Sequence, residues 1–313
     1  MNYRTCPLFL LMIFCLVSCR EGYVRLQGYA QGGTYRVIYN SEGVSLDSKQ
    51  MQEAVDSILN VIDTTFSGYN SKSQLSRYNR GELQSPSPLF ALTLRMARNF
   101  YDMTGGAVDA GSAPLYDIWG FGFKNDSLPS DSLIAEAMAL SAEWKQLNFN
   151  SFAQGLSCDL VASFLRDAGV RDMLVDIGEI YCCGRNPKGE GWKVGIDNPV
   201  DGNNNPGADL HGIWDSGERA CGVVTSGNYR KFYVVDGVKY SHTIDPRSGY
   251  PVTHSLLSAT IVAPTAAEAD ALATYCMVIG PDAARAYIES RPDIEGYLIS
   301  ADGDWVSEGF TLN

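Results

Sequence analysis

Residues 239–251, "KYSHTIDPRSGYP", place one of the three histidines of the chain beside an Asp-Pro pair, an arginine and a Gly-Tyr-Pro turn. A neutral imidazole with a pKa near ~6.5 can remove a proton from a hydroxyl and accelerate a reaction by about 10²–10⁴-fold. Pro246 and the turn at Gly249 would hold the loop backbone still, as a preorganised base requires. The pattern fits a general base at His242, and it equally fits a turn histidine bonded to a backbone carbonyl.

The segment "EADALAT" places Asp270 and Thr274 four residues apart, so both side chains would share one face of a helix. A carboxylate and a hydroxyl in this arrangement offer two hard oxygens to Mg²⁺, which takes about six oxygens near ~2.0–2.1 Å. The alternative is an exposed aspartate and a threonine that bonds back to a carbonyl in its own turn.

Two more segments have residue types that could bind a ligand. "SFAQGLSCD" (151–159) predicts a strand that passes through Gly155 into a helix, where backbone groups suit a phosphate or a metal-bound oxygen. A glycine that merely permits the turn is the alternative. "TGGAVDAGSAPLYDIWGFG" (104–122) brings Asp109 close to aromatic residues that could hold a planar heterocycle or form ordinary core. These aromatics are Tyr116, Trp119, Phe121 and Phe123.

The composition excludes several classes of partner and site. A net charge of −12 argues against nucleic acid and against a basic patch on anionic lipid. A polyanionic ligand would therefore need a metal or a few placed arginines. The sequence has no GxxxxGK[ST], GxGxxG, HExxH or GxSxG pattern. Five cysteines follow Cys19 without a CxxC pair, which predicts buried apolar residues rather than a zinc site or a disulfide framework. They are Cys158, Cys182, Cys183, Cys221 and Cys276.

The elements that must position these residues alternate between helices and hairpins. Two strands are predicted over 24–40 around a Gly32-Gly33 turn, followed by a helix over 46–66 with a capping box at Asp47 and Gln50. Further helices are predicted over 89–103, 131–144, 158–169, 265–280 and 282–291. Strands are predicted over 173–178, 192–197, 220–226, 230–237, 239–245 and 256–264, with two short ones closing the chain and a loop over 199–220. Hairpin-rich order favours the α+β class.

The N-terminus predicts export. An apolar run, "PLFLLMIFCLV", is too short to span a bilayer as a mature helix and is typical of a signal peptide. Its ending, "LVSC", resembles a lipoprotein box with cleavage before Cys19 and lipid on that cysteine; a plain secretory signal is the alternative. We expect a signal peptide over 1–18 and one domain over 19–313, lipid-anchored in the bacterial envelope, on the periplasmic side.

Taken together and in order, the motifs resemble the ApbE family, the FAD:protein FMN transferases. The matching segments include "QGGTYRVIY", "FSGYNSKSQLSRYN", "GGAVDAGSAPLYDIWGFG", "SGNYRKFYVVDGVKYSHTIDPRSGYPV" and "SATIVAPTAAEADALAT", spread from residue 28 to the end of the chain. The resemblance implies a T-fold-like α+β architecture that binds FAD and Mg²⁺. It also implies transfer of FMN to a threonine or serine hydroxyl, with release of AMP. Typical acceptors are flavin-carrying subunits of membrane redox pumps with a Ser/Thr-Gly-Ala-Ser/Thr-type motif.

The resemblance also assigns residues. His242 matches the family's catalytic histidine and is also placed among the residues that contact FAD. The metal ligands would be the side chains of Asp270 and Thr274 and the carbonyl of Ser157. Positions that contact FAD are matched by Gly32, Tyr69, Ala107, Val108, Asp109 and Gln154, and we add Ser226 and Arg230 near the phosphates.

Four departures from the family pattern are visible. Gln154 stands where lysine is frequent, so a charged contact to FAD becomes a neutral hydrogen bond. Leu156 replaces a common tyrosine, a single Gly178 replaces a Gly-Gly pair, and Ser241 replaces the first histidine of a frequent pair. None of these removes the base or the metal ligands. Two other functions remain open: an FAD pyrophosphatase that gives FMN and AMP, and a non-catalytic flavin-binding lipoprotein.

Overall fold

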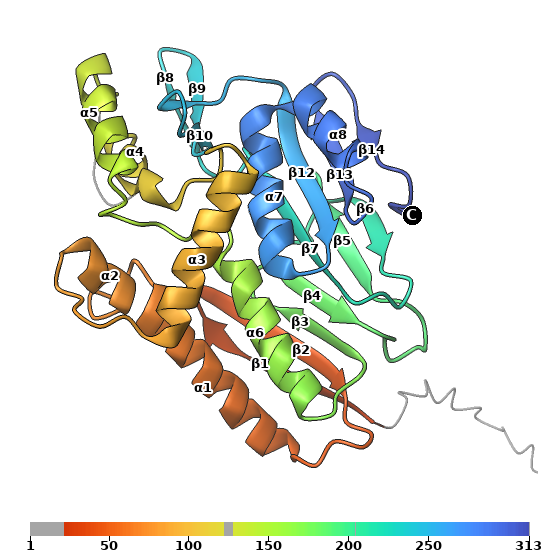
Figure 1. The fold of residues 1–313 in the computed structure, drawn as a ribbon. Coiled ribbons are helices and arrows are strands. Elements are labelled where there is room, and N and C mark those ends of the chain that lie inside the picture. The colour runs from red at the N-terminus through yellow and green to blue at the C-terminus, as the bar shows by residue number, and fades with distance from the viewer. Residues whose placement is uncertain (1–21, 122–127, 204, 313) are drawn as a thin grey trace, which may run out of the picture.

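A computed structural model describes residues 22–121, 128–203 and 205–312. Its centre is an eight-stranded sheet in the order β1-β2-β3-β4-β7-β12-β13-β14, in which every neighbouring pair is antiparallel (Figure 1). The strands are β1 (Tyr23–Ala30), β2 (Gly33–Asn40), β3 (Met173–Asp176), β4 (Ile180–Cys183), β7 (Cys221–Gly227), β12 (Leu256–Ala263), β13 (Glu295–Ser300) and β14 (Trp305–Val306). The expected α+β class is confirmed.

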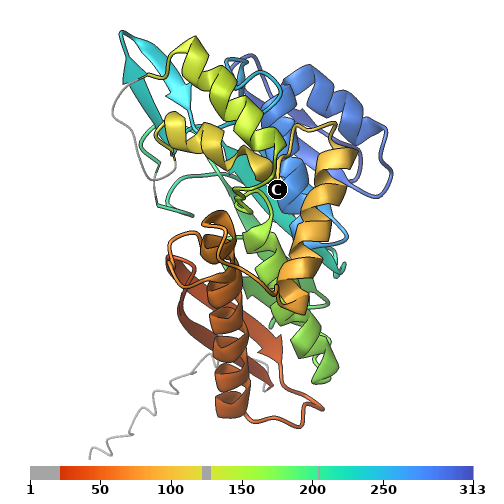
Figure 2. The same ribbon diagram turned by 60° about the vertical axis from the view of Figure 1, so that its left-hand side comes forward.

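Helices cover one face of this sheet, and a hairpin covers part of the other. The helices are α1 (Ser48–Phe66), α2 (Gln74–Asn79), α3 (Pro88–Met103), α6 (Ala153–Asp167), α7 (Ala266–Ile279) and α8 (Pro281–Glu289) (Figures 1 and 2). Apolar side chains of α1 and α6 meet those of β1 to β4 in one core, and α7 and α8 pack on β12 and β13 in a second. On the opposite face, β5 (Lys193–Asp197) and β6 (Leu210–Asp215) form a third core with the sheet.

A smaller lobe contains α4 (Ala113–Ile118), α5 (Asp131–Ala142) and two short hairpins. One hairpin consists of β8 (Phe232–Val235) and β9 (Val238–Ser241), and the other of β10 (Ile244–Asp245) and β11 (Tyr250–Pro251). Its own apolar cluster joins α4 and α5 to β10 through Leu115, Ile134 and Ile244. Because β10 also contacts α7, the histidine-bearing loop of this lobe lies beside the helix of the Asp-Thr pair.

Most predicted elements are present, and four predictions need correction. The strand expected before Gly155 is absent, because α6 begins at Ala153 and Gly155 lies in its first turn. The predicted loop over 199–220 contains β6, which pairs with β5. The strand predicted over 239–245 is interrupted at His242 and divides into β9 and β10. In the first hairpin the turn residues are Gln31 and Gly32, both with positive φ, and Gly33 already belongs to β2.

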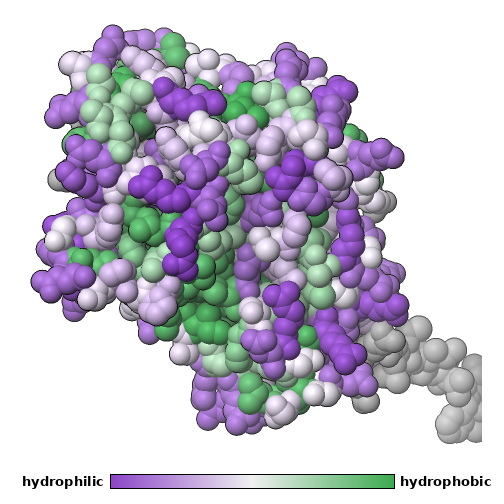
Figure 3. Space-filling model, in the orientation of Figure 1, coloured by the Kyte–Doolittle hydropathy of each residue, from purple (hydrophilic) through white to green (hydrophobic). Residues whose placement is uncertain are grey.

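The face shown in Figure 3 is mainly hydrophilic, with apolar residues gathered over α1 and α3. Val61 on α1 and Leu92 on α3 are exposed at 48% and 40%. Within the described residues, no helix is both long and apolar enough to cross a bilayer. The predicted signal peptide over 1–18 and the lipid-bearing Cys19 lie outside the described part of the chain.

Gly155 is required by packing rather than by a turn. A Cβ built on it would lie 2.2 Å from the carbonyl oxygen of Ala266, at the start of α7. We therefore expect Gly155→Ala to lower the free energy of unfolding by about 1–3 kcal/mol, because neither helix backbone can yield without repacking. Urea unfolding measures the change. Gly33→Ala is the matched control, since nothing lies within 4 Å of its Cβ position, and an equal loss in both variants would contradict the explanation.

Candidate functional site

Asp270 lies near the start of α7, with its carboxylate turned into the junction with α6. The side chain is only 5% exposed. Its Oδ2 accepts a hydrogen bond from the backbone N–H of Gly155 at 3.1 Å. The pKa of Asp270 is raised to about 7, mainly by burial; the Gly155 bond opposes the rise, and the negative charge of Asp159 adds to it. A buried carboxylate of this kind is stabilised by a cation.

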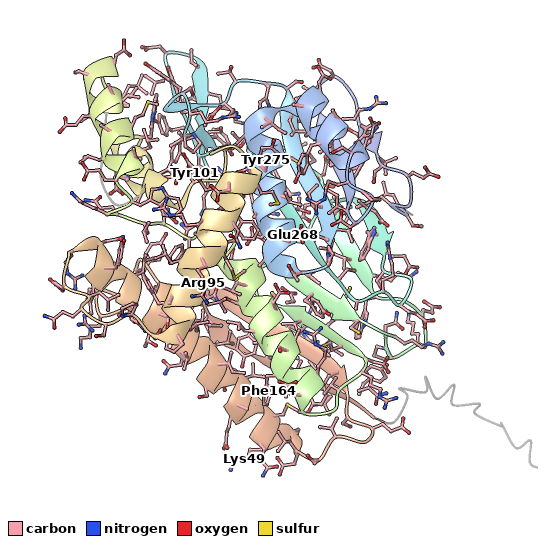
Figure 4. The ribbon with its side chains drawn as sticks, viewed as in Figure 1. Lys49, Arg95, Tyr101, Phe164, Glu268 and Tyr275 are labelled. Carbon is pink, nitrogen blue, oxygen red and sulfur yellow. The ribbon has the colours of Figure 1, made fainter. Side chains whose placement is uncertain are left out.

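Thr274 lies one turn further along α7 and is partly exposed. Figure 4 labels Glu268 and Tyr275, which bracket the Asp270–Thr274 pair on this helix. Threonines elsewhere, such as Thr65 and Thr93, donate to the carbonyl four residues earlier. Among the described residues Thr274 makes no such bond, so its hydroxyl remains available as a ligand. The predicted shared face of the pair is present.

Ser157, whose carbonyl is the predicted backbone ligand of the metal, is buried in α6. Its hydroxyl donates to the carbonyl of Ala153 at 2.7 Å. The Ser157 carbonyl belongs to a helical turn, in which it normally accepts the N–H four residues later. At the beginning of α6, by contrast, the Gly155 N–H is taken by Asp270. In a regular helix that N–H would donate to the carbonyl of Ser151, four residues earlier. Within the described residues, the Ser151 carbonyl therefore receives no helical N–H.

His242 lies between β9 and β10 and is partly buried. Its Nδ1 is 3.0 Å from the carbonyl oxygen of Lys231, so Nδ1 bears the proton and donates, which leaves Nε2 as an acceptor. Burial lowers the pKa of the imidazole below its ordinary 6.5, although the Lys231 bond opposes this. The ring is thus neutral near pH 7. The two predictions for His242 are therefore compatible: Nδ1 bonds to a backbone carbonyl, and Nε2 keeps the lone pair that a general base needs.

The loop around His242 is held from several sides, as the turn chemistry predicts. The hydroxyl of Thr243 donates to the buried side chain of Asn228, and the indole of Trp119 donates to the carbonyl of Gly249 at 2.8 Å. Arg247 makes two bonds to Asp245, each at 2.8 Å. These bonds fix the backbone on both sides of the imidazole.

The aromatic residues near Asp109 act as core. Trp119 stacks on Tyr240 with ring centroids 5.8 Å apart, and Phe121 stacks on Tyr233 at 5.1 Å. These contacts join α4 to the β8–β9 hairpin, and Phe121 also meets His242 edge-on at 6.3 Å. Tyr116 packs against the same cluster, whereas Phe123 lies outside the described residues. The heterocycle-binding alternative gains no support from these contacts.

Asp109 and its two predecessors surround a buried turn. The side chain of Asp109 accepts the N–H of Gly111 at 2.7 Å and begins η1 (Ala110–Ser112), a short 3-10 helix. Burial raises the pKa of Asp109 to about 6, while the Gly111 bond and the charge of Arg98 oppose the rise. Ala107 and Val108 are buried, so any contact with a ligand would come from their backbone.

The remaining predicted FAD contacts lie on several elements. Gly32 is at the open tip of the first hairpin, and Tyr69 is 81% exposed after α1. Gln154 begins α6, and its Nε2 would lie 2.5 Å from a Cβ on Gly178, so this glycine leaves room for the glutamine. Ser226 is near the end of β7 and pairs with β12. Arg230 forms an ion pair with Asp197, and its charge also acts on Glu179, which follows Gly178.

Two acids in this region escaped the sequence analysis. Asp159 on α6 accepts the N–H groups of Ala266 and Ala267 at 2.8 and 2.9 Å, and so caps α7 from a neighbouring helix. Glu179 follows Gly178 in the β3–β4 turn, where burial first, then the charge of Asp270, raises its pKa well above the ordinary value. An acid directly after a turn glycine is the only local signal for Glu179, and Asp159 has none.

Comparison with known proteins identifies the family. A model described as the ApbE family matches residues 31–298. An FAD:protein FMN transferase of Vibrio cholerae is 32% identical over 290 residues, covering 86% of this chain and 85% of that protein. The Haemophilus influenzae protein of the same name is 29% identical and covers 95% and 93%. This chain belongs to the ApbE family.

Solved structures agree with this family membership. The flavin transferase ApbE of Vibrio cholerae superposes with a TM-score of 0.78 at 29% identity, covering 91% of this chain and 97% of that one. The apo form of the Pseudomonas stutzeri flavinyl transferase ApbE gives 0.80 at the same identity, covering 91% and 95%. The predicted family and its architecture are thereby confirmed.

Proposed function

We propose that this protein is an FAD:protein FMN transferase that moves FMN from FAD to a hydroxyl of an acceptor protein, with Mg²⁺ bound and AMP released. Family membership supports the reaction. The observation that carries it to these residues is His242, a neutral imidazole whose Nδ1 is bonded to Lys231 and whose Nε2 can accept a proton. Its loop lies beside α7, the helix of Asp270 and Thr274.

The residues present fit Mg²⁺. Among the described residues no group of three or more His, Cys, Asp or Glu could hold a metal, which argues against an all-protein cage. Mg²⁺ does not need one, because it is commonly held by one or two carboxylates together with waters and substrate phosphates. The Asp270 carboxylate and the Thr274 hydroxyl would hold it, with the carbonyl oxygen of Ser157 in α6 as the backbone ligand. When bound, the ion neutralises charge on the pyrophosphate and polarises it.

Side chains of the protein would carry out the other steps of the transfer reaction. Nε2 of His242 takes the proton from the acceptor's threonine or serine hydroxyl, so that the oxygen can attack the phosphorus of the FMN half. The bonds that fix the loop hold the imidazole in position for this step. Gln154, at the start of α6, would replace a charged contact to FAD by a neutral one, which lowers affinity without removing catalysis.

The acceptor and the location complete the proposal. The acceptors would be flavoprotein subunits of membrane redox pumps that present a Ser/Thr-Gly-Ala-Ser/Thr-type motif. Anchoring through a lipid on Cys19 would keep the domain at the envelope membrane, on the periplasmic side, within reach of such subunits. The motif at residues 16–19 supports this anchor.

One experiment separates transfer from its alternatives. The mature protein is incubated with FAD, Mg²⁺ and a peptide that contains the acceptor motif, and the products are analysed by mass spectrometry. An FMN adduct on the peptide supports the proposal. FMN and AMP without an adduct would indicate a pyrophosphatase, and intact FAD would indicate a non-catalytic carrier; either result contradicts transfer.

The rate of transfer should fall at low pH for two reasons, and only one of the two falls should depend on the Mg²⁺ concentration. Activity is expected to fall as His242 is protonated, at a pH below 6.5 because burial lowers its pKa. A second fall near pH 7 should appear only at low Mg²⁺, because protons compete with the metal for Asp270. Rates measured between pH 5 and 9 at two Mg²⁺ concentrations test this expectation, and a fall near pH 7 that does not depend on Mg²⁺ would count against it.

A further inference from the structure

Two cysteines lie directly opposite each other in the central sheet, far along the chain from one another. Cys182 is in β4 and Cys221 is the first residue of β7, and the two are cross-strand partners. Their Sγ atoms are 3.9 Å apart, and the residues are 0% and 5% exposed. The flavin reaction proposed above uses neither thiol.

The backbone at this position already satisfies the requirements of a disulfide. Directly opposite residues of an antiparallel pair have Cα atoms about 4.5–5.5 Å apart. Disulfides span Cα distances of about 4.4–6.8 Å, with sulfurs about 2.05 Å apart. Side-chain rotation alone can therefore bring the two sulfurs together. Cys183, the next residue along β4, points to the other face because side chains alternate along a strand.

The surroundings distinguish the two thiols chemically. The two thiols share one hydrogen bond, in which either sulfur can donate. This bond, with help from the charge of Arg219, lowers the pKa of Cys221, and burial opposes the change. The same bond, together with burial, raises the pKa of Cys182. Cys221 is thus the better nucleophile, since the thiolate is the reactive form. Residues 217–220 are exposed immediately before Cys221, so fraying of this strand end would admit a reagent.

We propose that Cys182 and Cys221 form an intramolecular disulfide when the protein meets a small-molecule or protein disulfide as oxidant. The Cys221 thiolate attacks one sulfur of the oxidant, forms a mixed disulfide and releases one thiolate. Cys182 then loses its proton to solvent and attacks Cys221 Sγ, which forms the cross-strand bond and releases the second thiolate. The two cysteines are oxidised by two electrons, and the oxidant is reduced to two thiols.

The bond would stabilise the fold without touching the candidate site. It closes a loop of 39 residues and so should raise Tm by about 5–10 °C. It lies at the end of β4 away from Glu179 and at the start of β7, whereas Ser226 is near the other end of β7. The proposal does not depend on flavin transfer.

The test uses the mature protein, refolded or incubated with oxidised glutathione and compared with a dithiothreitol-reduced sample. Free thiols are alkylated, and the peptides are mapped by mass spectrometry. We expect a linked Cys182–Cys221 peptide, with Cys158, Cys183 and Cys276 alkylated. Cys276→Ala, in a separate core on α7, should retain the link, whereas Cys182→Ser should lack both the link and the rise in Tm. Full alkylation of both thiols after oxidation, or a link through Cys183, would overturn the proposal.

Discussion

Replacing His242 by alanine should lower the rate of FMN transfer by about 10²–10⁴-fold, the usual contribution of a positioned general base. Binding of FAD should remain, because His242 is only one of the nine residues assigned to FAD and the others lie on other elements, such as the first hairpin and α6. The expected signature is a fall in kcat with little change in the Kd for FAD, measured by single-turnover transfer and by flavin fluorescence.

Another histidine, His211, provides a control with the same side chain. His211 on β6 bonds to Asp304 at 3.0 Å, and β6 lies in the hairpin on the opposite face of the sheet. His211→Ala should therefore leave transfer unchanged. Loss of FAD binding in His242→Ala would mean that the imidazole holds the flavin rather than the proton. Full activity in that variant would exclude His242 as the base.

Local signals predicted much of this fold. The capping box at Asp47 and Gln50 and the apolar stripe of α1 are both present, with Met51, Val55 and Ile62 buried. The helix predicted over 265–280 is also present as α7, and Thr265 caps it. Such signals work because a capping bond or a helical stripe depends on residues only a few positions apart.

The errors arise where distant segments decide the local structure. Gly155 was predicted at a junction between a strand and a helix, yet it lies inside α6. It is a glycine because Ala266 of α7 leaves no room for a Cβ. β6 was missed because it lies in a Gly- and Asn-rich segment that is typical of a loop. Its strand conformation depends on pairing with β5 and on the burial of Trp214. Composition describes a segment in isolation, whereas pairing depends on its partner.

The candidate site shows the same division. The four-residue spacing of Asp270 and Thr274 predicted their shared helix face correctly. The sequence could not reveal that Gly155 would donate to Asp270, or that Asp159 and Glu179 would surround it with negative charge. These acids come from α6 and from the β3–β4 turn, and only the packing of the helices on the sheet brings them together.

Asp270→Asn should abolish the response to Mg²⁺ and lower transfer by at least about 10²-fold, because the carboxylate is the only charged ligand assigned to the metal. Stability gives a readout independent of activity. The pKa of Asp270 is raised from 3.8 to about 7, so the folded state binds an extra proton between these pH values and the wild-type protein loses stability as pH rises through them. In metal-free buffer the variant should therefore unfold at a higher Tm than wild type at pH 8, and this advantage should shrink toward pH 4.

Magnesium should reverse that order. A bound cation stabilises the wild-type carboxylate and leaves the amide almost unaffected, so Mg²⁺ should raise the Tm of wild type at pH 8 but not that of Asp270→Asn. Glu268→Gln is the matched control: Glu268 lies on the same helix, pairs with Arg291 at 2.9 Å and should keep both the Mg²⁺ response and the activity. A Mg²⁺-dependent rise in Tm that survives in Asp270→Asn would place the metal elsewhere. Its loss in that variant alone would tie the buried charge at the α6–α7 junction to the cation that the reaction requires.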